Sequence, residues 1–297
     1  MSAIKRAAGI VSSCLNTVLP RRSDGFHILL YHRTSPVYDG APHPGINVTP
    51  AQFREQLIGL QRRGCGFLSL RDVLEHRERN KALPPRTVVV TFDDGYYCNY
   101  EYAWPILREL EVPATIFVST AYLDGVEPFP FDPWGTTYYS HAPAEAYRPL
   151  TVEQCRTMMM DGAVEIGAHT HTHGDFRGTP DKLRVDLRTC LDVLKQHFEL
   201  EHIPFAFPYG RVQLGYAGGA LAEVAREVGV TCSLTTECHA NALDSDPYHW
   251  GRFNVYEWDT AASLDAKLNG WYEWAPRLQE RLLGAASRPA SASAGKL

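Results

Sequence analysis

Two short motifs in this chain carry side chains that could bind a metal ion and activate water. Residues 91–95 (Thr-Phe-Asp-Asp-Gly) supply two adjacent carboxylates, and residues 167–173 (Gly-Ala-His-Thr-His-Thr-His) supply three imidazoles. One carboxylate and two imidazoles would leave a coordination position open for water, and the second carboxylate could serve as a nearby base. This combination of groups is typical of a hydrolase.

Each motif also has a purely structural interpretation. Residues 93–95 could form a plain turn, but two like charges after a buried strand repel each other, and one of them usually needs a cation or a proton. The histidines could form a surface cluster. An extended segment would place all three on one side, whereas a helical turn would bring only His169 and His173 together.

The composition is that of an ordinary globular protein. The chain has 297 residues, of which 44% are hydrophobic and 21% charged, and this length can bury a large core. A net charge of -5 argues against a nucleic-acid partner, which usually needs a basic face. The seven cysteines are odd in number and form no CxxC pair, so we expect reduced thiols and a cytoplasmic protein.

The two ends of the chain are expected to lie outside the catalytic domain, which we assign to residues 25–285. Residues 1–24 predict an amphipathic helix, and its apolar face could pack on the domain or make peripheral contact with a membrane, which would make the protein membrane-associated. The residues of this face recur at helical spacing: Ile4, Ala8, Val11, Leu15 and Val18. Residues 286–297 are rich in Ala and Ser and predict a disordered tail.

Strand-like and helix-like segments alternate through the domain, which predicts a parallel sheet covered by helices. The expected strands are residues 26–32, 67–70, 87–92, 114–118, 164–168, 204–207, 231–234 and 253–256. We therefore expect a single α/β domain, a deformed (β/α)7-type barrel of mostly parallel strands, with an open Rossmann-type sheet as the second choice. The expected helices are residues 71–79, 152–160, 180–198 and 216–228, one that begins at Pro50, one that ends near Glu111, and a closing helix near residues 264–282.

The candidate side chains fall at the ends of expected strands, where barrel enzymes place their sites. Residues distant in sequence should therefore meet at one rim and form a single site. These strand-end residues are His32, Asp93, Asp94, His169, Pro208 and Tyr209.

The two motifs resemble those of the polysaccharide deacetylase family, the NodB-homology domain of carbohydrate esterases. Residues 91–95 match the family's first motif, TFDDG, and residues 169–173 match its second, H-[ST]-x-x-H. The resemblance covers about residues 25–255 and is most specific at these two motifs. Weaker matches are residues 28–32 and 48–70, which look like one branch of the family, and residues 205–210, which resemble its third motif.

By that resemblance, Asp94, His169 and His173 bind a divalent metal, most often zinc, and Asp93 is the general base. The implied reaction is attack of activated water on an acetamide carbonyl, which releases acetate and a free amine. The backbone N–H of Tyr209 could stabilise the oxyanion. The implied substrate is an N-acetylated sugar, polysaccharide or glycoconjugate.

Two positions depart from the family pattern. The arginine that usually precedes the third motif is absent, but Arg252 resembles an arginine of this branch and could pair with Asp93; it could equally be an ordinary surface residue. The late histidine that protonates the leaving amine is not evident either. We expect His32 to take this role in preference to His239 or His249.

Residues 124–147 lie in an insertion at about 121–150 and are rich in aromatic residues, including Trp134. Aromatic faces can stack on sugars or pack a compact loop against itself. Trp134, Pro208 and Tyr209 are the candidates for sugar contact. Two other functions stay open: an amide or imide hydrolase acting on a non-sugar substrate, and a carbohydrate-binding protein without catalysis, which the intact metal-binding motifs disfavour.

Overall fold

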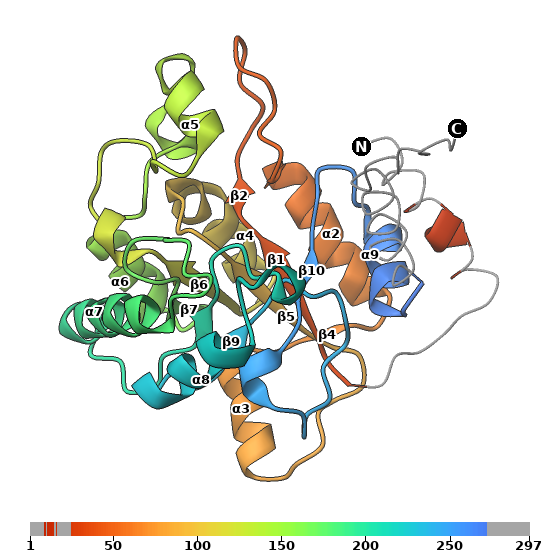
Figure 1. The fold of residues 1–297 in the computed structure, drawn as a ribbon. Coiled ribbons are helices and arrows are strands. Elements are labelled where there is room, and N and C mark those ends of the chain that lie inside the picture. The colour runs from red at the N-terminus through yellow and green to blue at the C-terminus, as the bar shows by residue number, and fades with distance from the viewer. Residues whose placement is uncertain (1–8, 10, 15, 17–24, 272–297) are drawn as a thin grey trace, which may run out of the picture.

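The computed structural model describes residues 9, 11–14, 16 and 25–271, and a parallel sheet lies at its centre (Figure 1). Most of the predicted N-terminal helix, with its proposed membrane contact, and all of residues 286–297 lie outside this part of the chain. Among the described residues, no helix combines the length and apolarity that crossing a bilayer demands. All seven cysteines are free thiols.

The strands of the main sheet pair in parallel, in the order β10-β1-β5-β6-β7-β8-β9, and β4 pairs with the start of β5. A bridge between Leu234 and Trp250 brings the β9 edge toward the β10 edge, so the sheet curves into a partly closed barrel. The expected fold class is confirmed. The strands are β1 (His27–Tyr31), β4 (Gly66–Phe67), β5 (Thr87–Phe92), β6 (Ala114–Val118), β7 (Val164–Ala168), β8 (Phe205–Ala206), β9 (Ser233–Leu234) and β10 (Phe253–Asn254).

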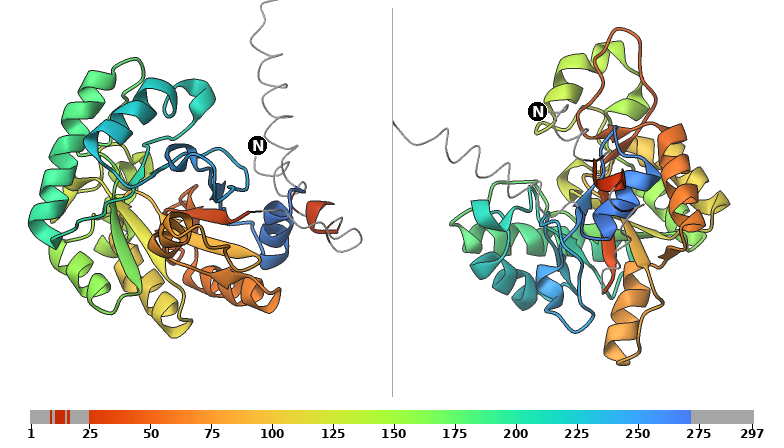
Figure 2. Two further views of the ribbon diagram at one scale, coloured as in Figure 1. Left: turned by 90° about the horizontal axis from the view of Figure 1, so that it is seen from below. Right: turned by 90° about the vertical axis from the view of Figure 1, so that its right-hand side faces the viewer.

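Helices cover the outside of this sheet, as the view from below in Figure 2 shows. The α-helices are α2 (Pro50–Arg62), α3 (Leu70–Glu78), α4 (Trp104–Glu109), α5 (Pro133–Tyr138), α6 (Val152–Met160), α7 (Pro180–Phe198), α8 (Gly219–Val228) and α9 (Ala261–Leu268). Shorter turns are the π-helical η1 (Asn99–Ala103) and the 3-10 helices η2 (Thr120–Tyr122), η3 (Tyr139–His141), η4 (Ala144–Ala146), η5 (Val212–Leu214) and η6 (Pro247–His249).

The central strand β5 is buried along its whole length. Val88, Val90 and Phe92 enter one hydrophobic cluster, whereas Val89 enters another on the opposite face. A continuous run of β-branched residues suits a strand that is covered on both faces. Because both faces are buried, the register of β5 is fixed, and so is the direction in which the residues after Phe92 leave the sheet.

Capping boxes begin several of the helices. Thr49, Ser69 and Thr151 each accept a hydrogen bond from the backbone N–H three residues later, and the side chain at that later position returns the contact. One strand is shorter than expected for this reason. Ser69 already caps α3, so β4 ends at Phe67 and the expected strand over residues 67–70 is wrong in its second half.

Two long excursions rise above the C-terminal ends of the strands (Figure 1). One is the loop between β2 (Arg33–Thr34) and β3 (Asn47–Val48), and the other is the insertion of residues 121–150, which contains α5. The indole Nε1 of Trp134 donates a hydrogen bond to the carbonyl of Pro42 at 2.6 Å. This contact ties the two excursions together over the end of the sheet.

Candidate active site

The acidic motif lies where β5 ends and the chain turns. The backbone N–H of Asp93 donates to the carbonyl of Tyr31 at 3.0 Å, which extends the sheet by one residue. Asp94 and Gly95 then adopt positive φ values of 72° and 77°. A Cβ atom at Gly95 would lie 2.8 Å from a methyl carbon of Val118, so this turn requires glycine.

The histidine motif also forms a turn. Thr170 and His173 have positive φ values of 66° and 55°, and the N–H of His173 donates to Thr170 Oγ1 at 3.0 Å. The rings of His169 and His173 meet with centroids 5.0 Å apart. His171 instead places its Nδ1 2.9 Å from Thr120 Oγ1. The three histidines therefore do not all face one side: only His169 and His173 come together, as expected for a turn.

Asp94, His169 and His173 converge on one point. Asp94 Oδ1 lies 3.4 Å from His169 Nε2 and 3.3 Å from His173 Nε2. All three residues are buried, and one ligand atom from each lies within 4.8 Å of the others. One carboxylate oxygen and two imidazole nitrogens fit a divalent cation such as Zn²⁺. Among the described residues, no other group of three potential ligands meets this spacing.

Arg252 holds both carboxylate oxygens of Asp93. Its Nη1 donates to Oδ1 at 2.6 Å and its Nη2 to Oδ2 at 2.8 Å, while its Nε donates to the carbonyl of Thr235 at 3.0 Å. Arg252 is 0% exposed, so it is not an ordinary surface arginine. Asp93 Oδ2 lies 3.9 Å from His169 Nε2. The clamped carboxylate therefore borders the three-residue cluster.

Burial and charge act in opposite directions on these groups. Burial would raise the pKa of Asp93, but Arg252 and His169 together bring that pKa below its ordinary value. Burial likewise opposes ionisation of Asp94, yet hydrogen bonds from His169 and His173 hold the pKa of this carboxyl well below its usual range. Burial lowers the pKa of His169, whereas the two carboxylates raise it above normal. Both acids are thus anionic at neutral pH.

The buried ion pair between Arg252 and Asp93 predicts a large effect on the stability of the fold. Replacing Arg252 with methionine should lower the free energy of unfolding by about 3–5 kcal/mol, because Asp93 would stay buried without its partner. Urea denaturation of both proteins measures the difference. Arg54→Met is the matched control, because its ion pair with Glu109 is exposed and such pairs contribute little. Equal unfolding midpoints for the two variants would contradict a stabilising clamp.

His32 follows β1 and lies in the electrostatic field of the same cluster. Burial lowers its pKa, Asp94 and Asp93 raise it, and the net direction is below the ordinary value. The imidazole is therefore neutral at pH 7. A neutral imidazole beside a carboxylate pair can accept a proton and pass it on.

The three candidates for sugar contact differ in what they touch. Tyr209 reaches the cluster, with its ring centroid 5.1 Å from that of His173, and it is 47% exposed. Pro208 is buried just before it. Trp134 is used differently, because its indole binds the β2–β3 loop and lies 5.2 Å from the guanidinium of Arg33.

Phe131 is the aromatic residue of the insertion that reaches the cluster. Its ring stacks on His173 with a centroid distance of 3.7 Å and an interplanar angle of 13°. The sequence pattern does not distinguish Phe131 from the other aromatic residues around it, because the contact depends on how the whole insertion folds back over the site.

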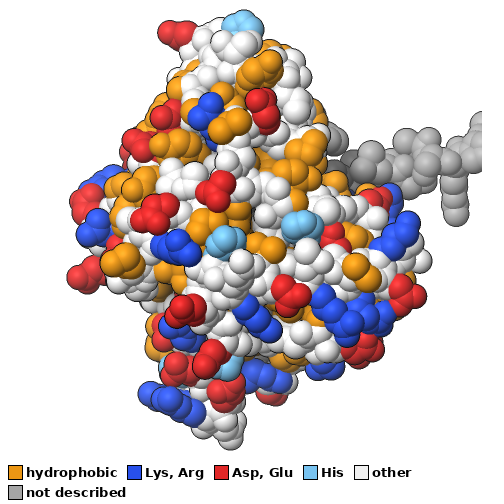
Figure 3. All heavy atoms as spheres, turned by 90° about the vertical axis from the view of Figure 1, so that its left-hand side faces the viewer, with side chains coloured by type: hydrophobic (Ala, Val, Ile, Leu, Met, Phe, Trp, Pro, Cys, Tyr) orange, Lys and Arg blue, Asp and Glu red, His pale blue; other side chains and the backbone are white. Residues whose placement is uncertain are grey.

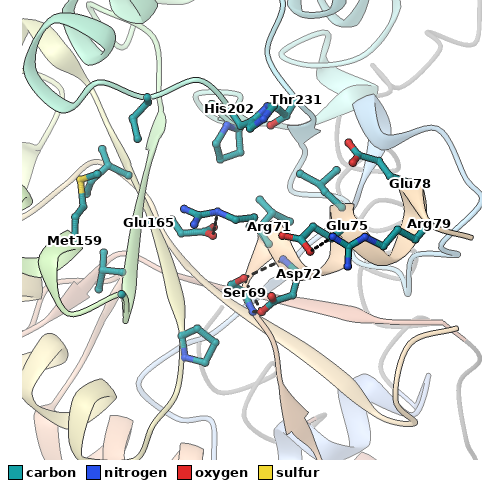
Figure 4. Close-up of a pocket in the computed structure, with 18 residues that line it drawn as sticks. Ser69, Arg71, Asp72, Glu75, Glu78, Arg79, Met159, Glu165, His202 and Thr231 are labelled. Atoms are coloured by element: carbon teal, nitrogen blue, oxygen red, sulfur yellow. Dashed lines mark hydrogen bonds and ion pairs between the residues drawn. The ribbon is translucent and has the colours of Figure 1, made fainter. Parts of the chain in front are cut away.

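A hollow of about 740 Å³ lies at the opposite end of the sheet from the candidate site, below the starts of β7, β8 and β9 (Figure 4). Four of its charged side chains form two ion pairs. Arg71 Nε lies 3.3 Å from Glu165 Oε1, and Arg79 lies 3.3 Å from Glu75. None of the candidate catalytic, metal-binding or sugar-contact residues lines it. On the face shown in Figure 3, acidic and basic side chains are interspersed without a large field of one sign.

Comparisons with known proteins find one matching family model, together with similar curated proteins and solved structures. A family model described as "Polysaccharide deacetylase" matches residues 80–233. The poly-beta-1,6-N-acetyl-D-glucosamine N-deacetylase of Staphylococcus aureus (strain MSSA476) is 25% identical over 236 residues, which cover 76% of this chain and 73% of that protein. IcaB from Ammonifex degensii shares the fold with a TM-score of 0.66 at 22% identity, over 85% of this chain and 98% of that structure. A de-N-acetylase from Aggregatibacter actinomycetemcomitans gives 0.69 at 18% identity, over 82% and 100%.

Proposed function

Because this chain belongs to the polysaccharide deacetylase family, we propose that it is a metal-dependent hydrolase that removes N-acetyl groups from an N-acetylated polysaccharide. The observation that carries the proposal is the convergence of Asp94, His169 and His173 beside the clamped carboxylate of Asp93. The proposed substrate class follows the relative from Staphylococcus aureus, whose name specifies a polymer of N-acetyl-D-glucosamine.

Asp94, His169 and His173 would hold the cation, and Zn²⁺ suits this ligand set best. When bound, such an ion supplies a Lewis acid that lowers the pKa of water from 15.7 to about 7. Two observations support this assignment: Asp94 is anionic at neutral pH, and the Nε2 atoms of both histidines lie close to the same oxygen, Asp94 Oδ1.

The chain's own residues would then move the protons. Asp93 takes a proton from the attacking water, and Arg252 keeps its carboxylate ionised and oriented. The backbone N–H of Tyr209 donates to the developing oxyanion. His32 accepts the proton that Asp93 has taken and gives it to the amide nitrogen as the C–N bond breaks. Water and the acetamide thus yield acetate and a free amine.

The test measures two activities of the zinc-loaded protein: acetate release from poly-β-1,6-N-acetylglucosamine and soluble N-acetylglucosamine oligomers, and hydrolysis of a panel of small imides. Release from the polymer or the oligomers is expected. Turnover of the imides alone would show an amide or imide hydrolase. Sugar binding without acetate release would show a binding protein and would overturn the proposal.

The role of His32 gives a prediction of its own. His32→Ala should lower kcat on the N-acetyl substrate by about a hundredfold, because general acid catalysis contributes at least this much. The activity of His32→Ala on an aryl acetate ester should fall far less, because the phenolate of the ester leaves without a proton. Bound zinc, measured by elemental analysis, should not change. An equal loss on both substrates would exclude His32 as the proton donor.

A further inference from the structure

The two histidines of the cluster are held in different ways. His169 donates its Nδ1–H to the carbonyl of Ala206 at 2.8 Å, which fixes the ring plane and leaves Nε2 for the ion. The Nδ1 of His173 is buried and has no hydrogen-bond partner among the described residues. Metal-binding histidines almost always use the second nitrogen for such a bond. Another contact must therefore orient the ring of His173.

Aromatic rings enclose His173. Phe131 lies parallel to it, with a centroid distance of 3.7 Å and an interplanar angle of 13°, and Tyr209 meets it at 73°. A parallel ring at this distance blocks rotation of the imidazole out of its plane. The contact also suits the bound state, because an imidazole that binds a cation becomes electron-poor and is attracted to the electron-rich face of a phenyl ring.

The segment that carries Phe131 is firmly anchored. The next residue, Asp132, forms a buried ion pair with Arg33, and their side chains are 5% and 1% exposed. Arg33 also donates from Nε to the carbonyl of Ala146 at 3.2 Å. Phe131 itself packs on Phe129, with centroids 5.0 Å apart. The position of the Phe131 ring is therefore determined independently of any metal.

We propose that Phe131 is the positioning residue for His173, and that its stacked ring replaces the hydrogen bond that His173 lacks. This inference rests on the proposed function only in taking His173 as a metal ligand. It assigns the insertion a task at the metal site, in addition to the contact between its Trp134 and the β2–β3 loop. In this arrangement the ion pair of Arg33 and Asp132 supports the ligand geometry through Phe131.

The test compares zinc affinity in three variants, measured by competition with a chromophoric chelator. Phe131→Leu keeps an apolar side chain but loses the flat ring, and it should weaken zinc binding by about 10–100-fold, the usual cost of losing a group that orients a ligand. Phe131→Tyr keeps the ring and should restore the original affinity. Tyr139→Leu is the matched control: Tyr139 lies in the same insertion, is 47% exposed and packs its ring on Tyr147, so the change removes an aromatic ring without altering zinc affinity.

Cobalt substitution adds a readout that a purely structural role would not change. The visible absorption bands of bound Co²⁺ report ligand geometry, and they should shift in Phe131→Leu but not in Tyr139→Leu. Unchanged zinc affinity in Phe131→Leu, or an equal loss in Tyr139→Leu, would overturn the role of Phe131 alone. If the unaltered protein bound no zinc, or if Asp94→Asn did not reduce binding, both the metal site and this inference would fall.

Discussion

Replacing His169 with glutamine is expected to abolish zinc retention and to lower acetate release by about a thousandfold. The change removes one of two imidazoles that face Asp94, and the activation of water by a metal is worth several kcal/mol, where each 1.36 kcal/mol is a factor of ten in rate. Zinc content after dialysis and the initial rate of acetate release measure the two effects.

His171 provides a matched control two residues away in the same motif. Its Nδ1 lies next to Thr120, and the ring takes no part in the three-residue cluster. His171→Gln should therefore keep both zinc and turnover. A loss of zinc from His171→Gln as large as from His169→Gln would contradict the assignment of the ligands.

Asp93→Asn is expected to lower kcat by about 10²–10⁴-fold, the usual contribution of a general base, while zinc stays bound. Asparagine has nearly the same shape but cannot take a proton, so binding and catalysis should separate. Because the pKa of Asp93 is lowered, the carboxylate of the unaltered protein is already ionised at neutral pH, and raising the pH further should not make it a more available base.

The control for this prediction is Asp175→Asn. Asp175 lies two residues beyond His173, is 44% exposed and pairs with Arg177, so its replacement should leave kcat unchanged. The change also takes the anionic partner from buried Arg252. Circular dichroism must therefore show first that Asp93→Asn is folded. Full turnover by folded, zinc-loaded Asp93→Asn would exclude Asp93 as the base.

Much of the fold follows from local patterns in the sequence. The run at residues 87–92 is β-branched and buried on both faces, and the expected strand has the bounds of β5. Helices α6 and α7 also have their expected bounds. The later strands are shorter than expected. β8 keeps only Phe205–Ala206, because sequence patterns reveal apolar runs but not how many residues find a partner across the sheet.

The site is less predictable from the sequence, because its contacts are not local. The choice between the two histidine arrangements depends on positive φ values at Thr170 and His173, which are uncommon for residues other than glycine. The partner of Arg252 lies 159 residues away and is reached only because β10, β1 and β5 are neighbours. The contact of Phe131 with His173 depends on the path of an insertion that has no periodic pattern.

The neighbouring positions of β10 and β1 have a consequence for how the protein is made. β1 is the first strand of the sheet to leave the ribosome, and it lacks its neighbour β10 until the end of the sheet has been synthesised. Arg252 comes just before that last strand, so a nascent or truncated chain ending before residue 252 would hold the Asp93 carboxylate without its guanidinium. Activity should therefore be switched on late in translation, when almost all of the domain has emerged.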